Sequence, residues 1–189
     1  MLLDALKNFE WLNEPQEVSF TDIGVKIRAG ERTDFWQDFR HGLHKDNGHF
    51  FYREAAGDFE LTVKWSFIDV SGFCQCGLMG RIDESNWFKL SVLAEDAHRP
   101  QLAGVVTNFG ISDMALQPIN AENGEIWYKV RAEKGIISLS YSANGKDYVQ
   151  ARLFQPLKDA SALKIGAYIC NPSERKFSAL LAAMNFTQL

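Results

Sequence analysis

Residues 59–67 read Phe-Glu-Leu-Thr-Val-Lys-Trp-Ser-Phe, a strict alternation of apolar and polar side chains. Successive side chains of an extended strand point to opposite faces, so the apolar residues share one face and the polar residues share the other. Such a segment is stable where one face is buried and the other meets water, as in an antiparallel sheet. The pattern predicts a half-buried strand whose core-facing residues are Phe59, Leu61, Val63, Trp65 and Phe67.

Many other segments have the length and composition of strands, and short polar turns separate them. The expected strands cover residues 25–29, 73–82, 87–94, 101–108, 127–133, 136–142, 148–154, 164–170 and 177–186. Asn144-Gly145 lies between two of them and is a strong hairpin signal, because both residues accept positive φ. One short helix is expected over residues 2–12, before Pro15.

A chain of 189 residues, of which 46% are hydrophobic, can form a full core without support from disulfides or metals. No repeat, linker or low-complexity segment divides it, so a single domain is expected over residues 1–189. Aromatic residues make up 13% of the chain, which favours strands, where flat side chains pack on a pleated surface. The predicted fold is all-β: a sandwich or jelly roll of two antiparallel sheets with a short N-terminal helix.

The formal net charge is −4 and the basic residues are scattered, so we expect no nucleic-acid partner. No apolar run is long enough to span a membrane, and the N-terminus lacks the basic start of a secretory signal, so we expect no membrane partner either. The cysteines, Cys74, Cys76 and Cys170, are an odd set in strand-like sequence. We therefore expect reduced thiols and a cytoplasmic protein.

Several short motifs occur in an order that matches a known family. They are Asn13-Glu14-Pro15, Thr33-Asp34-Phe35-Trp36, Asn47-Gly48-His49-Phe50, Gly57-Asp58-Phe59, Gly77-Leu78-Met79 and Ser112-Asp113. Through them, and over nearly the whole chain after Asn13, the sequence resembles the family called domain of unknown function 1349, also described as regulation-of-enolase-like. The resemblance implies a concanavalin A-like jelly roll. Leu93 and Met114 depart from the family pattern, which implies a changed pocket if those side chains line one.

The concanavalin A-like fold that this resemblance implies is also found in glucanases, whose chemistry requires two facing carboxylates. No Glu-x-Asp-x-Glu or Glu-x-Asp-x-x-Glu run occurs, and adjacent acids such as Glu95 and Asp96 point apart on a strand. Asp58 and Glu60 are at alternate positions, but we expect both to be solvated. No Gly-x-Ser-x-Gly motif and no Gly-rich phosphate loop is present, so we assign no catalytic residue and expect no cofactor. An enzyme is the less favoured interpretation.

Histidines are concentrated in one polar segment, where His41, His44 and His49 accompany Asp46. Zinc sites with such spacing usually add cysteine or a distant histidine from a firm scaffold, and short histidine spacings alone are weak evidence. We expect loop histidines without a metal. His49 stands apart from the others because it lies in one of the family motifs.

A polar binding surface is the remaining candidate site. Strand alternation places Gln75, Arg81, Lys89 and Tyr168 on the sheet face opposite the expected core. The resemblance adds three residues from loops at the rim, which are Trp36, His49 and Asp113. Aromatic rings and cations together suit a carbohydrate or another small polar ligand. If the site is an open groove, replacing Lys89 should abolish binding and leave the melting temperature nearly unchanged.

Three functions follow from these observations. The first is a non-catalytic binding module whose concave face holds a carbohydrate or small polar ligand. The second is a regulatory domain that contacts a protein, such as a metabolic enzyme, as the family description implies. The third is a glycosidase-like enzyme without the usual carboxylate pair. Beside all three stands the plainer interpretation of the candidate surface as an ordinary solvated sheet face, with Trp36 closing the end of the sandwich.

Overall fold

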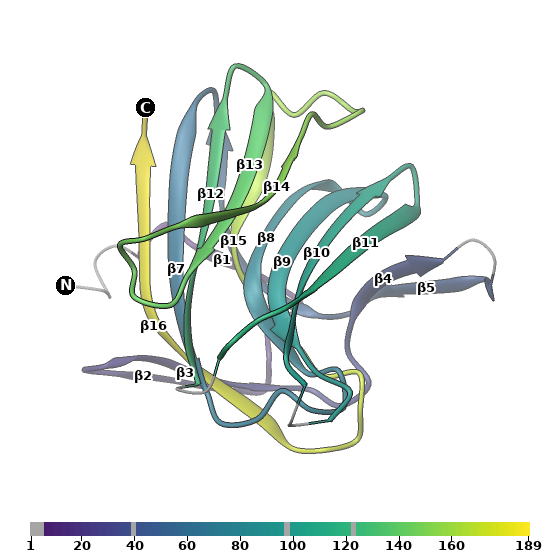
Figure 1. Ribbon diagram of the computed structural model, residues 1–189, viewed down its shortest axis with the longest axis vertical. Helices are drawn as coiled ribbons and strands as arrows, with labels where there is room; N and C mark the ends of the chain where they lie inside the picture. The colour runs from purple at the N-terminus through teal and green to yellow at the C-terminus, as the bar shows by residue number, and fades with distance from the viewer. Residues whose placement is uncertain (1–5, 39–40, 97–98, 122–123) are drawn as a thin grey trace.

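The computed structural model describes residues 6–38, 41–96, 99–121 and 124–189, and it consists of two large antiparallel sheets and one small hairpin (Figure 1). In spatial order, sheet A contains β1 (Glu10–Leu12), β6 (His49–Ala56), β15 (Ala162–Cys170), β8 (Gln75–Asp83), β9 (Asn86–Leu93), β10 (Gln101–Asn108) and β11 (Ile111–Pro118). Sheet B contains β14 (Val149–Phe154), β13 (Ile136–Ser142), β12 (Glu125–Glu133), β7 (Phe59–Phe67), β16 (Phe177–Gln188), β3 (Gly24–Ala29) and β2 (Glu17–Thr21). The sandwich confirms the predicted all-β fold.

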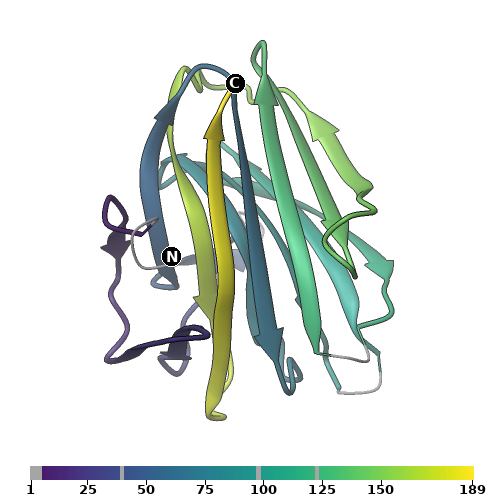
Figure 2. The same ribbon diagram turned by 90° about the vertical axis from the view of Figure 1, so that its left-hand side faces the viewer.

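The core lies between the two sheets, and β7 shows how the sequence specifies it. Its odd-numbered residues from Phe59 to Phe67 are buried and its even-numbered residues are half-buried, so the predicted alternation is confirmed. Trp65 is fully buried, and its indole Nε1 donates a hydrogen bond of 2.9 Å to the carbonyl oxygen of Gly77 on sheet A. Figure 2, in which sheet B faces the viewer, shows β7 between β16 and β12.

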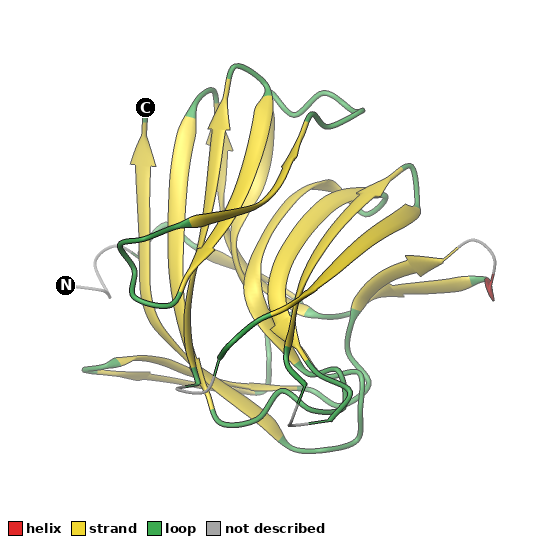
Figure 3. Cartoon of the chain, viewed as in Figure 1, coloured by secondary structure: helices red, strands yellow, loops and turns green. Residues whose placement is uncertain are grey.

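The predicted N-terminal helix is wrong where the structure describes the chain. Residues 10–12 form strand β1, which pairs with β6, and strands supply nearly all the regular structure in Figure 3. The ring centroid of Phe51 on β6 lies 4.7 Å from that of Trp11 and 5.4 Å from that of Phe9. Pairing with an open sheet edge while these rings pack together outweighs a weak helical pattern. Residues 1–5 of the predicted helix lie outside the described part.

The hairpin formed by β4 (Phe35–Asp38) and β5 (Leu43–Asp46) packs on the outer face of sheet A and extends away from the sandwich (Figure 1). We call this hairpin the arm. Phe35, at its base, is fully buried in a second apolar cluster, separate from the core between the sheets. The other members of this cluster are Phe50, Tyr52, Met79, Trp87, Val105, Tyr168 and Cys170. The centre of sheet A is therefore covered on both faces.

Candidate functional site

The residues that alternation placed on one face do share that face. Gln75 and Arg81 lie on β8, Lys89 on β9 and Tyr168 on β15, three neighbouring strands of sheet A. The intervening side chains, such as Leu90 on β9, point into the core between the sheets. All four candidate residues are nevertheless buried, and Lys89 is only 3% exposed. The arm covers the face that the sequence suggested would be open.

Lys89 holds the first strand of the arm at its base. Its ammonium donates hydrogen bonds to the carbonyl oxygen of Phe35 at 2.7 Å, to Oε1 of Gln75 at 3.0 Å and to Oδ1 of Asp34 at 3.2 Å. An ammonium has three protons to donate, so each of them has a partner within the protein. Lys89 therefore acts as a structural tether in this conformation and has no proton free for a ligand.

Arg81 holds the second strand of the arm at the same base. Its guanidinium makes two hydrogen bonds to the carboxylate of Asp46, at 2.5 Å and 2.9 Å. Bidentate pairs of this kind fix orientation as well as distance. Asp34 precedes β4 and Asp46 ends β5, so two cations of sheet A bind the two carboxylates that flank the arm.

Tyr168 and Gln75 complete this buried network. The hydroxyl of Tyr168 donates to Oε1 of Gln75 at 3.0 Å. Burial raises the pKa of Tyr168 well above its ordinary value, so the phenol keeps its proton and remains a donor. Among the described residues, only Trp87 Nε1 and Ser91 Oγ are buried side-chain polar atoms without a hydrogen-bond partner. Nearly all buried polar groups of this face therefore form hydrogen bonds within the protein.

The three predicted rim residues lie in three different environments. Asp113 is on β11, where it pairs with Val106, a member of the core cluster, so it belongs to the opposite face of sheet A from Lys89. Its carboxylate accepts from Nη2 of Arg152 at 2.6 Å. The structure thus does not bring Asp113 together with the other candidate residues.

His49 is a buried structural residue at the start of β6. Its Nε2 accepts a hydrogen bond of 2.9 Å from the backbone N–H of Gly30, so Nδ1 carries the proton and donates to the carbonyl oxygen of Asn13 at 2.5 Å. Burial lowers the pKa of His49, and the bond to Asn13 opposes this only in part. The imidazole is therefore neutral and links two loops at the base of the arm.

Trp36 is the one predicted site residue on the outer side of the arm. It is half-buried and pairs across the hairpin with Lys45. A hollow of about 390 Å³ opens beside them, and we call it the Trp36 hollow. It is lined by Arg32, Asp34, Trp36, Leu43, Lys45, Pro172 and Glu174. Arg32 is paired with Glu174, whereas the exposed ammonium of Lys45 has no partner among the described residues.

The sequence reasoning missed the rest of this hollow. Residues 35–38 alternate between side chains that face sheet A, Phe35 and Gln37, and side chains that face outward, Trp36 and Asp38. The sequence itself does not show this alternation, because Phe35 and Trp36 are both apolar and Gln37 and Asp38 are both polar. Nothing in the sequence indicated that Leu43 and Lys45 would stand beside Trp36, because their pairing depends on the hairpin register.

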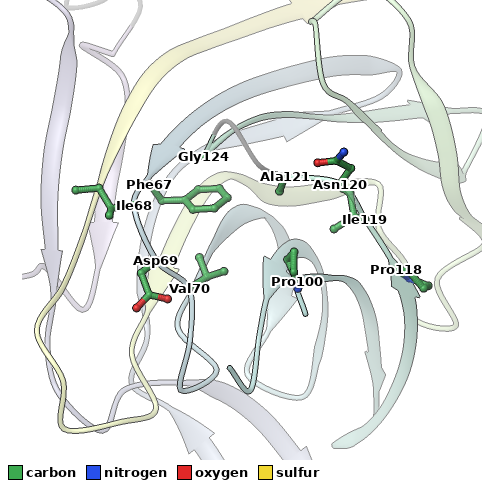
Figure 4. A pocket seen from close by; sticks show the side chains of 10 residues that line it. All are labelled: Phe67, Ile68, Asp69, Val70, Pro100, Pro118, Ile119, Asn120, Ala121 and Gly124. Carbon is green, nitrogen blue, oxygen red and sulfur yellow. The ribbon is translucent and has the colours of Figure 1, made fainter. Parts of the chain in front are cut away.

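A larger cavity, of about 620 Å³, lies at one end of the sandwich (Figure 4). Phe67, Val70, Pro100 and Ile119 form the apolar part of its wall, and Asp69 and Asn120 add polar groups. Its one acidic group, Asp69, already has partners, because its carboxylate accepts hydrogen bonds from Ser71 and from Arg175. The Trp36 hollow differs in that the ammonium of Lys45 has no partner among the described residues and can orient a ligand, so we favour the Trp36 hollow.

The structure gives no support for a metal site or a reactive thiol in the described part of the chain. No group of three or more His, Cys, Asp or Glu side chains converges there. His41 contacts Asp38 and His44 contacts Gln37, while His98 lies outside the described residues. The three cysteines are free and buried, and burial raises the pKa of each thiol. No helix found in the same residues could span a membrane.

Comparisons with known proteins agree with the fold. The profile of a family described as a protein of unknown function (DUF1349) matches residues 11–189. The protein named Regulation of enolase protein 1 from Saccharomyces cerevisiae is 32% identical over 163 residues, which cover 86% of this chain and 80% of that protein. A crystal structure of a functionally unknown protein from the same yeast has a TM-score of 0.89 at 28% identity, with 97% of this chain and 98% of that chain covered.

Two more distant structures are similar in fold alone. The carbohydrate binding module CBM66 from Bacillus subtilis has a TM-score of 0.62 at 15% identity, and the similarity covers 97% of each chain. The GH43 protein BlXynB from Bacillus licheniformis has a TM-score of 0.76 at 18% identity, and the similarity covers 96% of this chain but 37% of that one. The same sandwich thus occurs both as a separate module and as one part of a larger protein.

Proposed function

We propose a function on the premise that this chain belongs to the family of proteins of unknown function DUF1349, whose profile spans residues 11–189. The chain acts as a non-catalytic binding module. Its ligand is a carbohydrate or another small polar molecule, and the binding site is the Trp36 hollow on the outer side of the arm. The observation that carries this proposal is the double attachment of the arm through Lys89–Asp34 and Arg81–Asp46.

An arm whose two strands are both held at the base can present a preorganised surface. The two ion pairs and the buried ring of Phe35 fix its base against sheet A. Trp36 and Lys45 project from the opposite side of the same two strands. A ligand that meets a fixed surface loses less free energy to the ordering of its site, which favours affinity.

The lining of the hollow suits a small ligand with both apolar and polar groups. The Trp36 indole provides a flat apolar surface, and Leu43 and Pro172 extend it. The ammonium of Lys45, which has no partner in the described part of the chain, and the exposed guanidinium of Arg32 can donate to hydroxyl or carboxylate oxygens. A volume of about 390 Å³ falls within the range of small-molecule sites. In this proposal the ligand lies outside the arm, whereas the sequence suggested the face beneath it.

A second function is supported by a separate observation. The 32% identical yeast relative is named for the regulation of enolase, which suggests that a protein is the binding partner. The outer side of the arm would then serve as a contact surface for a metabolic enzyme, with Trp36 as its central aromatic anchor. Interface anchors are enriched in tryptophan and arginine, and this surface has both.

The experiment is a carbohydrate and metabolite screen by calorimetry on the whole chain, repeated with Trp36→Ala and Lys45→Gln. Trp36→Ala should weaken any ligand about tenfold or more because the stacking surface is lost. Lys45→Gln should weaken it about two- to fivefold, since an exposed ammonium contributes less. Lys146→Gln, on an exposed turn remote in sequence from the arm, is the matched control and should change nothing.

The outcomes separate the two functions. A ligand whose affinity is unaffected by Trp36→Ala would show that the hollow is not the site. If no small molecule binds, purified enolase is the next probe, measured by the same method. Enolase binding that Trp36→Ala removes would replace the first function with the second, and the absence of both kinds of binding would count against the arm as a recognition surface.

A further inference from the structure

β11 forms a long, open edge of sheet A. Each large sheet has two edges, and the four edge strands are β1, β2, β14 and β11. β1 has 3 residues, β2 has 5 and β14 has 6, whereas β11 has 8. An edge strand exposes unpaired backbone N–H and C=O groups, which can pair with a strand of another chain. The longest of the four edges is therefore the strongest candidate for such pairing.

Proteins usually protect their edge strands with charged residues, prolines or bulges. β11 has the sequence Ile-Ser-Asp-Met-Ala-Leu-Gln-Pro, with one charged residue and a proline only at its last position. The charge of Asp113 is already compensated by Arg152 of β14. No shift in register interrupts its pairing with β10. The arm contacts the start of β11, where the backbone N–H of Gln37 donates to Oγ of Ser112, but the usual protection is missing along the rest of the strand.

Apolar side chains are exposed along the same strand. Ile111 is 61% exposed, and Met114 and Leu116 are each 44% exposed. Met114 and Leu116 lie on one face of the sheet, since side chains two positions apart in a strand share a face. An apolar, almost uncharged edge with free backbone groups can pair with another strand that has few charges. Two copies of this edge would not repel each other electrostatically.

We propose that β11 pairs antiparallel with β11 of a second copy of this chain, so that the two A sheets join into one continuous sheet. A two-fold axis perpendicular to the sheet relates the strands and keeps each side chain on its own face. With the axis at Ala115, Met114 lies opposite Leu116 of the other copy, and Asp113 lies opposite Gln117. This register places apolar side chains together and separates the two aspartates.

Backbone geometry agrees with the same register. Phe109 and Gly110 both have positive φ and form the two-residue turn before β11. In a hairpin of this type, Ile111 and every second residue after it bond to β10, which leaves the groups of Ser112, Met114 and Leu116 directed outward. Met114 and Leu116 can therefore exchange hydrogen bonds with the second copy, while Ala115 faces Ala115 in a close pair without such bonds. The inference does not depend on the proposed ligand function.

The first test measures mass in solution by sedimentation or light scattering over a concentration series. The native chain should have twice the mass of a single chain at high micromolar concentration. The double variant Met114→Lys and Leu116→Lys should remain a single chain, because lysine on an edge opposes pairing. The control Ile136→Lys changes a comparably exposed residue on sheet B and should leave the dimer intact. A native chain that stays monomeric, or a dimer that persists in the double variant, would overturn the proposal.

The second test reads the register directly and does not depend on the stability of the lysine variants. Ala115→Cys introduces one exposed thiol into a protein whose three native thiols are buried. If Ala115 faces its own copy, mild oxidation should form a covalent dimer in high yield, because close antiparallel pairs fit disulfide geometry. Asp113→Cys alone should not cross-link, whereas its mixture with Gln117→Cys should. Efficient cross-linking of Asp113→Cys alone would exclude the register centred on Ala115.

Discussion

Lys89 and Asp34 join β9 to the base of the arm through an Nζ–Oδ1 contact of 3.2 Å, although they are 55 positions apart in the sequence. The lysine side chain is almost fully buried, while Asp34 keeps some contact with water. Removing one partner of such a pair leaves the other charge buried without a compensating charge, which is strongly destabilising. The pair therefore couples the stability of the fold to the position of the arm.

Replacing Lys89 by alanine is expected to lower the free energy of unfolding by about 3 kcal/mol, the lower end of the range for breaking a buried pair. Urea unfolding of the variant and the native chain measures this loss. Lys146→Ala removes an exposed lysine and should leave the unfolding midpoint unchanged. An unchanged midpoint for Lys89→Ala would support the original expectation of an open ligand contact and contradict the tether.

Gly48 leaves room for the ring that anchors the arm. A Cβ atom added at Gly48 would lie 2.5 Å from Cε2 of Phe35 and 2.6 Å from Cδ2. Because Phe35 is fully buried, its ring cannot move aside freely, and Gly48→Ala should cost about 1–3 kcal/mol. The same change in a Phe35→Leu background should cost clearly less. Equal costs in both backgrounds, measured by a double-mutant cycle, would show that the two residues are independent.

The neutral state of His49 makes stability depend on pH. Its pKa in the folded state lies below the ordinary value of 6.5, so the unfolded chain binds the proton more readily. The contribution of His49 is complete above about pH 6.5 and is lost as the pH falls below this value toward the folded-state pKa. We expect a decline in the urea midpoint over this window.

His49→Gln should remove that part of the decline, because glutamine does not titrate. His41→Gln serves as the control, since His41 is exposed and interacts only with Asp38 among the described residues. A pH profile that is the same for His49→Gln and the native chain would assign the decline to other groups.

The three cysteines should be unreactive in the folded protein and reactive after unfolding. All three are buried and unbridged, and burial raises the pKa of each, which keeps the thiols protonated. A colorimetric thiol reagent should therefore detect three thiols in denaturant and almost none without it. Rapid reaction of the native protein would show that the sandwich opens around Cys74 or its neighbours.

The parts of the fold that the sequence predicted are those where burial alternates along one strand. β7 has a buried and a half-buried face, and its pattern determines the face of every residue. The same reasoning correctly grouped Gln75, Arg81, Lys89 and Tyr168. It could not show that this face is covered, because the cover comes from the arm, a segment distant in the sequence.

The elements that the sequence analysis missed have weaker patterns. β11 is exposed on both faces along much of its length, so apolar and polar residues need not alternate there. Each strand of the arm has only 4 residues, too few for a clear period. The strand that contains Trp11 pairs with the open edge of β6, a partner distant in the sequence, so the local pattern alone favoured a helix there.

The hydrogen bond from Trp65 to Gly77 has a practical consequence for spectroscopy. Trp65 lies between the sheets, whereas Trp87 lies in the apolar cluster beneath the arm and Trp36 lies on the arm itself. Emission from these indoles therefore reports on different parts of the molecule. A single-tryptophan variant that keeps Trp65 would follow the separation of the two sheets, and one that keeps Trp87 would follow release of the arm. Coincident transitions would mean that the sandwich and the arm unfold as one cooperative unit.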